Sequence, residues 1–199
     1  VLVTDLNEGP TMSSASRTIA ENSAINTAVG AVVTGTDPDG GGDPARRCAT
    51  CTGMLTYSIT GGNSDGIFQI EAATGQIAVA KAEIDYDPAS FSPKQYSLTV
   101  TATVAGGRTD AATVTIAVTN VNEVPVFTAS TIAEKSIDEN SAIDTIVGSA
   151  VQATDVDVGT TLTYTLPDSE TVFKIDSTTG QISLKSAVLD HEAKDAYSV

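Results

Sequence analysis

An internal repeat is the most informative feature of this chain. The segment IAENSAINTAVG, starting at Ile19, returns as IDENSAIDTIVG, starting at Ile137. The glutamates inside the two copies, Glu21 and Glu139, lie 139 − 21 = 118 residues apart. A repeat of this length predicts one structural unit that is used twice. Two domains of about 110 residues each fit the chain of 199 residues.

The periodicity of the sequence indicates strands rather than helices. Residues 96–104 (YSLTVTATV) and 112–120 (ATVTIAVTN) alternate apolar with polar side chains, and Ala-Gly-Gly lies between them. Alternation with period two is typical of half-buried strands, and the glycines predict a hairpin turn. Similar segments recur about every ten residues, separated by Gly, Pro, Asp and Asn, as in a β-sandwich. The chain is therefore predicted to be an all-β antiparallel sandwich protein.

The first copy is longer than the second because of one insertion. Asp39 and Asp85 are separated by 85 − 39 = 46 residues, whereas Asp157 and Asp190 are separated by 190 − 157 = 33. The first copy thus has 46 − 33 = 13 additional residues, most of them in the stretch GGGDPARRCATCTG. A glycine-rich polar insertion between strands is predicted to be a surface loop.

The second copy stops before its expected end. Residues 197–199 (YSV) align with 96–98 (YSL), which begin the penultimate strand of the first copy. We therefore expect the second sandwich to lack its last two strands within this sequence. The predicted organisation is the end of a preceding repeat and a linker over 1–10, a repeat over 11–122, and a truncated repeat over 123–199.

The charge balance restricts the class of partner. The chain has 10 Lys and Arg against 25 Asp and Glu, a formal net charge of −15. Nucleic acid and anionic membrane surfaces bind basic faces, so neither is an expected partner. No apolar run approaches the ~20 residues that cross a bilayer, so no direct membrane insertion by this segment is expected. Cations are the natural ligands, and the smallest is a metal ion.

Acidic residues recur together with the scaffold. Asp37 and Asp39 return as Asp155 and Asp157, Asp85 and Asp87 return as Asp190 and Glu192, and Asp5, Asn7 and Glu8 return as Asn120, Asn122 and Glu123. Carboxylates that converge from separate loops repel one another unless a cation compensates them. Calcium fits this set because it takes ~6–8 oxygen ligands and tolerates irregular geometry, whereas zinc prefers His or Cys and magnesium stricter octahedra.

These motifs, in this order and present twice, resemble the cadherin repeat in the divergent form of microbial surface proteins. The glutamate of Glu21-Asn22, the pair Asp37 and Asp39, the element Asp85-Tyr86-Asp87 and the linker before Pro125 are similar to the motifs of that family. The resemblance covers nearly the whole chain. It implies tandem seven-stranded Greek-key sandwiches of immunoglobulin-like or cadherin-like type, with calcium bound between successive repeats.

The resemblance also assigns ligands. Two to three Ca²⁺ would bind at the junction of the two repeats, through Glu21, Asp85, Asp87, Asn120, Asn122, Glu123, Asp155 and Asp157. Partial half-sites toward neighbouring repeats would be formed by Asp5, Asn7, Glu8, Asp37 and Asp39, and by Glu139, Asp190 and Glu192. Three positions depart from the family pattern: Asn120 replaces an aspartate, Asp87 replaces a glutamate, and Val104 stands where a late aspartate is expected.

Cys48 and Cys51 are the only cysteines. Zinc would need two further thiol or imidazole ligands, and the one histidine, His191, lies in the other repeat. A thioredoxin-like redox pair would need a βαβ context, which the sequence lacks. The favoured interpretation is a disulfide that closes the inserted loop in an oxidising environment. Free or intermolecularly bonded thiols are the alternative.

The expected function is mechanical rather than enzymatic. We expect a calcium-rigidified segment of an extracellular adhesin or filament that mediates cell–cell or cell–surface attachment, with further repeats and a homophilic or other cell-surface protein as partners. Two alternatives come from other classes: a carbohydrate-binding accessory module, and a self-associating fibre unit whose missing strands are donated by a neighbour. A glycosidase is disfavoured because the acids repeat with the scaffold and the chain has no Trp.

Overall fold

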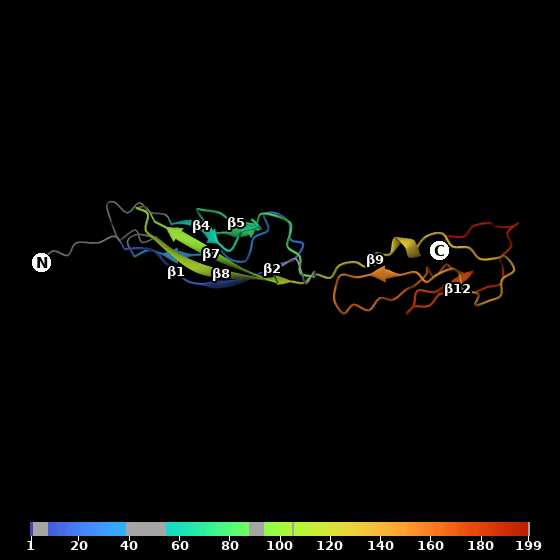
Figure 1. Ribbon diagram of the computed structural model, residues 1–199. Helices are drawn as coiled ribbons and strands as arrows, with labels where there is room; N and C mark the ends of the chain where they lie inside the picture. The colour runs from blue at the N-terminus through green and yellow to red at the C-terminus, as the bar shows by residue number, and fades with distance from the viewer. Residues whose placement is uncertain (2–7, 39–54, 88–93, 105, 199) are drawn as a thin grey trace. The chain divides into compact units, whose positions relative to one another are not determined.

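The computed structural model describes residues 1, 8–38, 55–87, 94–104 and 106–198. The chain divides into two compact units, Val1–Val121 and Asn122–Val199 (Figure 1). The inserted loop of the first copy, with Cys48 and Cys51, lies outside the described residues.

The main layer of the first unit is a four-stranded sheet with the order β2-β8-β7-β4. Its strands are β2 (Ala15–Ala20), β4 (Thr56–Gly61), β7 (Gln95–Thr103) and β8 (Thr109–Thr119). Strands β7 and β8 form the antiparallel hairpin that the alternating pattern predicts, and Figure 1 shows them side by side. Strand β2 pairs in parallel with the free side of β8, and β4 pairs antiparallel with β7.

The second layer is built from shorter ladders. Strands β5 (Phe68–Ile70) and β6 (Ile77–Val79) pair antiparallel, and residues 26–33 run along β6 through a bridge between Ala28 and Ala78. Strand β1 (Thr11–Met12) pairs with β3 (Gly35–Thr36) at the end of the sandwich. The first unit is therefore the all-β sandwich that the sequence predicts.

The core lies between these layers, and the alternation of the strands determines which side chains enter it. In β7 and β8, Leu98, Val100, Val114 and Ile116 are completely buried, while their sequence neighbours face outward. They pack in one cluster with the buried side chains of the second layer. Complete burial of a side chain of this size contributes roughly 1.5–3 kcal/mol to folding.

The second unit repeats the second layer of the first. It contains β9 (Val126–Phe127) paired with β10 (Ala153–Thr154), β11 (Phe173–Ile175) paired with β12 (Ile182–Leu184), and a 3₁₀ helix at Ala129–Thr131. Individual hydrogen bonds recur as well. The Val147 N–H donates to Ile182 O, as the Val29 N–H donates to Ile77 O in the first unit.

The main sheet has no counterpart among the described residues of the second unit. Residues 133–138 and 163–168 correspond to β2 and β4, but they are not strands. In the first unit these strands pair with β8 and β7, and the chain reaches only the start of the β7 counterpart. There the ring of Tyr197 meets Phe173 edge-on at 5.6 Å between centroids, as Tyr96 meets Phe68 at 4.9 Å. Among the described residues of the second unit, no strand follows β12.

Candidate metal centre

Glu21 is held at the end of β2 by a change of backbone direction. Its N–H donates to Thr119 O at 3.0 Å, which continues the pairing with β8. The next residue, Asn22, has φ 56°, a left-handed conformation that Asn tolerates better than most residues, and its N–H donates to Ile84 O at 2.9 Å. The chain turns here, and the side chain of Glu21 enters the interior with 2% exposure.

The buried carboxylate of Glu21 connects three segments of the first unit. Oε2 accepts the backbone N–H of Tyr86 at 2.6 Å, and Oε1 accepts the backbone N–H of Val121 at 2.8 Å. A buried charge needs such partners because desolvation of an isolated carboxylate is very unfavourable. Glu21 therefore fixes the 85–87 loop and the end of the first unit relative to β2.

The same loop brings two more carboxylates beside Glu21. Asp85 and Asp87 each offer an oxygen, and these oxygens and one of Glu21 all lie within 4.8 Å of one another. Asp85 Oδ1 also accepts the N–H of Asp87 at 3.1 Å, which tightens the loop. Calcium binds oxygens at 2.3–2.6 Å, so two ligands of one ion lie at most about 5 Å apart. The three predicted ligands thus converge with a spacing that suits one Ca²⁺.

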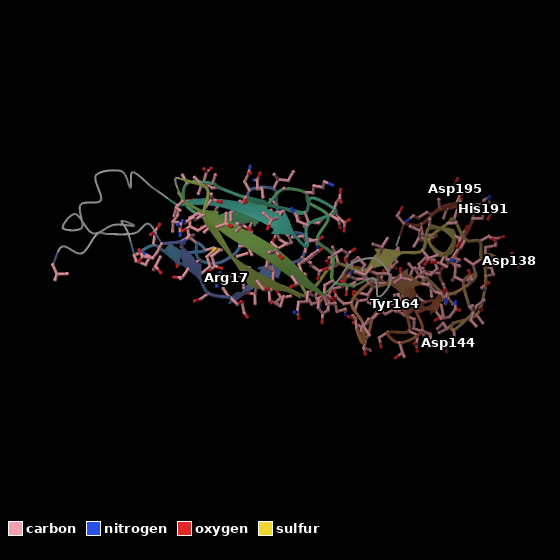
Figure 2. All side chains as sticks on the ribbon, turned by 60° about the vertical axis from the view of Figure 1, so that its left-hand side comes forward. Arg17, Asp138, Asp144, Tyr164, His191 and Asp195 are labelled. Carbon is pink, nitrogen blue, oxygen red and sulfur yellow. The ribbon has the colours of Figure 1, made fainter. Side chains whose placement is uncertain are left out.

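The second unit reproduces this arrangement. Oxygens of Glu139, Asp190 and Glu192 lie within 4.8 Å of one another, and all three side chains are exposed. Glu139 Oε2 accepts the N–H of His191 at 3.0 Å, just as Glu21 accepts that of Tyr86. Figure 2 shows His191 and Asp138, the neighbour of Glu139, at the same end of this unit. The recurrence in two units shows that the convergence is encoded by the repeat.

The beginning of the second unit contains the other predicted ligands. The N–H of Glu123 donates to Asp157 Oδ2 at 2.8 Å, and the N–H of Asp157 donates to Asp155 Oδ1 at 2.9 Å. Asn122 Nδ2 donates to Glu123 O at 2.9 Å. The Asp155–Asp157 loop is therefore attached to the segment that begins the unit. This donor set, carboxylates with amide and backbone carbonyl oxygens, again suits calcium.

Several predicted ligands are not part of these groups. Asn120 is exposed at the end of the first unit, where it follows β8. Asp5, Asn7 and Asp39 lie outside the described residues, so only Glu8 and Asp37 of their half-site are described. Val104, at the position of an expected aspartate, is buried and belongs to the apolar residues of the first unit.

Sequence reasoning missed the groups that orient Glu21. They are the backbone N–H donors of Tyr86 and Val121, and a backbone donor has no residue signature that could reveal it. The ring of Tyr86 has a further contact, because Lys94 Nζ lies 3.9 Å from its centroid. A cation–π contact of this kind stabilises the position of the 85–87 loop.

Among the described residues, no helix is long and apolar enough to cross a membrane. The acidic groups and their loops all belong to the β-units.

Comparisons with known proteins agree with this architecture. The sequence profile of the cadherin domain matches residues 15–119, more than half of the chain. Human Protocadherin Fat 4 is 34% identical over 157 residues, covering 76% of this chain and 3% of that protein. The Drosophila melanogaster protocadherin-like wing polarity protein stan is 36% identical over 176 residues, covering 83% and 4%. The chain therefore spans only a small part of these relatives.

A crystal structure of mouse cadherin-23 EC22–24 has the same fold. It superposes with a TM-score of 0.63 and 26% identity, over 94% of this chain and 57% of that one. A crystal structure of human CDH23 EC21–23 gives a TM-score of 0.60, also at 26% identity, over 96% and 58%.

Proposed function

Because this chain belongs to the cadherin family, we propose that it is a calcium-rigidified segment of an extracellular adhesin or filament that mediates attachment. Repeats of this family are extracellular adhesion modules rather than enzymes, and they typically bind calcium at the linkers between repeats. The observation that carries the proposal is the convergence of Glu21, Asp85 and Asp87, with Glu21 hydrogen-bonded to Val121 at the end of the first unit.

The proposed repeats are residues 11–122 and 123–199, with residues 1–10 closing a preceding repeat. Two to three Ca²⁺ would bind where the two repeats join. Their ligands would be six carboxylates and two amides: Glu21, Asp85, Asp87, Asn120, Asn122, Glu123, Asp155 and Asp157. Six carboxylates have a formal charge of −6, which three divalent ions would neutralise. When bound, calcium supplies positive charge and several oxygen-binding positions at once.

The residues of the chain would then transmit this binding to the linker. Glu21 already holds the N–H of Val121, and Asp157 already holds the N–H of Glu123. The Glu21 and Asp157 carboxylates thus each accept a hydrogen bond from a backbone N–H that lies close in sequence to the boundary of the units. In the absence of metal, mutual repulsion of the carboxylates would weaken both hydrogen bonds, and the linker between the repeats would be flexible. With metal, the segment would become stiff.

The exposed group of Glu139, Asp190 and Glu192 would be completed by a following repeat, and that of Asp5, Asn7, Glu8, Asp37 and Asp39 by a preceding one. Further repeats of the same array are therefore the first expected partners, and homophilic or other cell-surface contacts follow from the role in adhesion. The relatives named above are animal proteins, so the proposal rests on the cadherin family as a whole and not on a microbial subgroup.

Small-angle scattering with and without a calcium chelator tests the stiffening. The wild-type chain should change from a narrow to a broad distribution of maximum dimensions when calcium is removed. Asp157→Asn should behave as the chelated protein even in calcium, because one junction carboxylate is lost. Glu139→Gln, in the incomplete group, is the matched control and should behave as the wild type. Identical scattering curves with and without chelator would refute the proposal.

A further inference from the structure

The parallel pair of β2 and β8 joins the beginning of the first unit to its end. Its residue pairs run without a break from Ala15 opposite Val114 to Ala20 opposite Thr119. One further hydrogen bond, from the Glu21 N–H to Thr119 O at 3.0 Å, continues this ladder. Figure 1 shows the two strands side by side. The ladder thus connects the first long strand of the unit directly to its last.

The direction of the two strands determines how the ladder responds to a pull on the chain. Tension that enters the unit before β2 pulls Ala15 backward along the strand, while tension that leaves after β8 pulls Thr119 forward. Because the strands are parallel, these forces slide one strand along the other. Sliding loads all the hydrogen bonds of the ladder together, whereas a hairpin pulled at its open end loses them one after another. A parallel terminal pair therefore opposes stretching more strongly than a hairpin.

The segment before β2 has fewer bonds to the rest of the unit. Strand β1 pairs with β3 through Thr11 and Met12 alone, and the Met12 N–H also donates to Asp110 Oδ2 at 2.7 Å. These contacts should break first under tension, and the tension then reaches β2. The β2–β8 ladder is therefore the first extended set of hydrogen bonds along the path of the force.

Arg17 also attaches β2 to the opposite layer. Its Nε donates to Ala31 O at 3.1 Å and its Nη2 to Val32 O at 3.4 Å, while its Nη1 donates to Ser16 O at 3.0 Å. The side chain, labelled in Figure 2, lies so close to Gly30 that a Cβ there would collide with its Cδ. A planar guanidinium makes such a set of bonds in a fixed geometry, which an ammonium group does not. Strand β2 is therefore held from two sides.

The described residues of the second unit have neither feature. Residues 133–138 correspond to β2 and are not a strand. Lys135 occupies the position of Arg17, next to Gly148, and its Nζ donates to the Ser149 hydroxyl at 3.3 Å. The chain therefore contains its own reference for a unit without the ladder.

We propose that the β2–β8 ladder, residues 15–20 with 114–119, is a mechanical clamp that keeps the first unit folded under tension, and that Arg17 is a positioning residue of this clamp. The inference rests on the proposed function, because a segment of an adhesin or filament transmits tension between its ends. It adds a mechanical element that needs no metal. Calcium would stiffen the linker between repeats, whereas the clamp protects the interior of one repeat and should act equally in chelator.

Constant-force spectroscopy of the whole 199-residue chain, held by tags at both ends in chelator, tests the clamp. Unfolding of residues 8–121 releases roughly 400 Å of chain and that of residues 122–199 about 270 Å, at ~3.5 Å per residue, so the two units are told apart. At the same force, the first unit should unfold at least about tenfold more slowly than the second, because several hydrogen bonds must break together.

A second pulling direction separates the clamp from overall stability. A clickable non-natural residue at Ala24, which is exposed just after β2, takes the place of the N-terminal tag and leaves the cysteines untouched. Tension then separates the strands from the end where Ala20 meets Thr119, and the bonds break one after another. Unfolding of the first unit should be at least about tenfold faster than from the chain ends. Equal rates in the two directions would overturn the proposal.

Arg17→Lys tests the positioning role and introduces the residue that the second unit has there, so the fold should accept it. Unfolding from the chain ends should accelerate roughly tenfold, as expected for the loss of one to two hydrogen bonds. Asn63→Ala is the matched control, because it removes two hydrogen bonds to Phe68 in the other layer. It should lower equilibrium stability but leave this rate unchanged, since those bonds are still intact when the clamp breaks.

Equal acceleration by Arg17→Lys and Asn63→Ala would contradict the role of Arg17. A difference between the two pulling directions that appears only in calcium would overturn the clamp, because bound ions rather than the ladder would then resist the force. A chain that binds no calcium and still shows the difference in chelator would support the clamp while refuting calcium-dependent stiffening.

Discussion

Glu21 and Val121 are separated by 100 residues and are joined by a hydrogen bond of 2.8 Å from the Val121 N–H to the Glu21 carboxylate. The other oxygen of Glu21 accepts the N–H of Tyr86. One buried side chain therefore relates β2, the 85–87 loop and the end of the first unit. The length of a glutamate and both of its oxygens are needed for this role.

Glu21→Gln should destabilise the first unit even without calcium. An amide has one oxygen, so its NH₂ group would face one of the two backbone N–H donors, and a buried donor would lose its acceptor. The expected decrease in the free energy of unfolding is about 1–3 kcal/mol. Glu139→Gln, at an exposed site, should cost less than about 0.5 kcal/mol. Denaturant titrations in chelator compare the two variants, and equal effects would contradict the structural role of Glu21.

Tyr57→Phe should show how a repeated hydrogen bond supports each sandwich. The Tyr57 hydroxyl accepts the Gly35 N–H at 3.0 Å, and Tyr164 accepts the Ala153 N–H at 3.1 Å in the second unit. Removal of either hydroxyl leaves a part-buried N–H without its acceptor, with an expected loss of about 1 kcal/mol in the unit that contains it. Amide hydrogen exchange at Gly35 and Ala153 reads the two units separately. Faster exchange in the unmutated unit would contradict the prediction that each hydroxyl stabilises only the unit that contains it.

Leu98→Ala should be the most damaging single change in the main sheet. Leu98 is completely buried at the centre of β7, so truncation leaves a cavity and should cost about 2–5 kcal/mol. Thr99→Ala, the next residue of the same strand, is exposed and should change the free energy of unfolding by less than about 0.5 kcal/mol. Thermal unfolding of both variants tests the predicted inward and outward alternation. Equal losses of unfolding free energy in the two variants would contradict the burial of Leu98 in the core.

Glu170 should make the second unit sensitive to acid. Its carboxylate accepts the N–H groups of Phe173 at 2.9 Å and Val172 at 2.7 Å, and these bonds, that of Phe173 first, lower its pKa below the ordinary 4.5. A lowered pKa in the folded state gives stability that is present above about pH 4.5 and is lost as the pH falls through the folded value. Asp176, whose pKa is lowered chiefly by its bond from the Thr179 N–H, acts in the same direction.

Glu170→Gln should remove the pH-dependent part of this contribution. The difference in unfolding temperature between wild type and Glu170→Gln should be largest at neutral pH and should shrink toward pH 3. A difference that stays constant over this range would show that the charge of Glu170 does not stabilise the turn.

Much of the fold could be predicted from the sequence because its determinants are local or repeated. The alternation around Leu98 and Val114 predicts the β7–β8 hairpin, and the repeated glutamates predict that Glu21 and Glu139 occupy equivalent places. Residues 160–166 show what alternation alone does not predict, because they do not form a strand. They alternate like a strand, but a strand also needs a hydrogen-bonding neighbour, and alternation does not say whether one is present.

The candidate site could likewise be predicted only in part. The acidic side chains could be predicted because Asp and Glu residues recur at the same spacing in both repeats. The structure brings Glu21, Asp85 and Asp87 together. The backbone N–H of Val121, which orients Glu21, could not be predicted, since every residue except proline offers the same donor. Its position depends on where β8 ends, which only the fold determines.

Isothermal titration calorimetry measures the proposed calcium binding itself. The folded wild-type chain, titrated at millimolar calcium, should bind two to three ions, with heat that is strongly reduced in Asp85→Asn and unchanged in Asp190→Asn, its counterpart in the exposed group of the second unit. A flat titration of chain shown to be folded by circular dichroism would contradict calcium binding by these carboxylates.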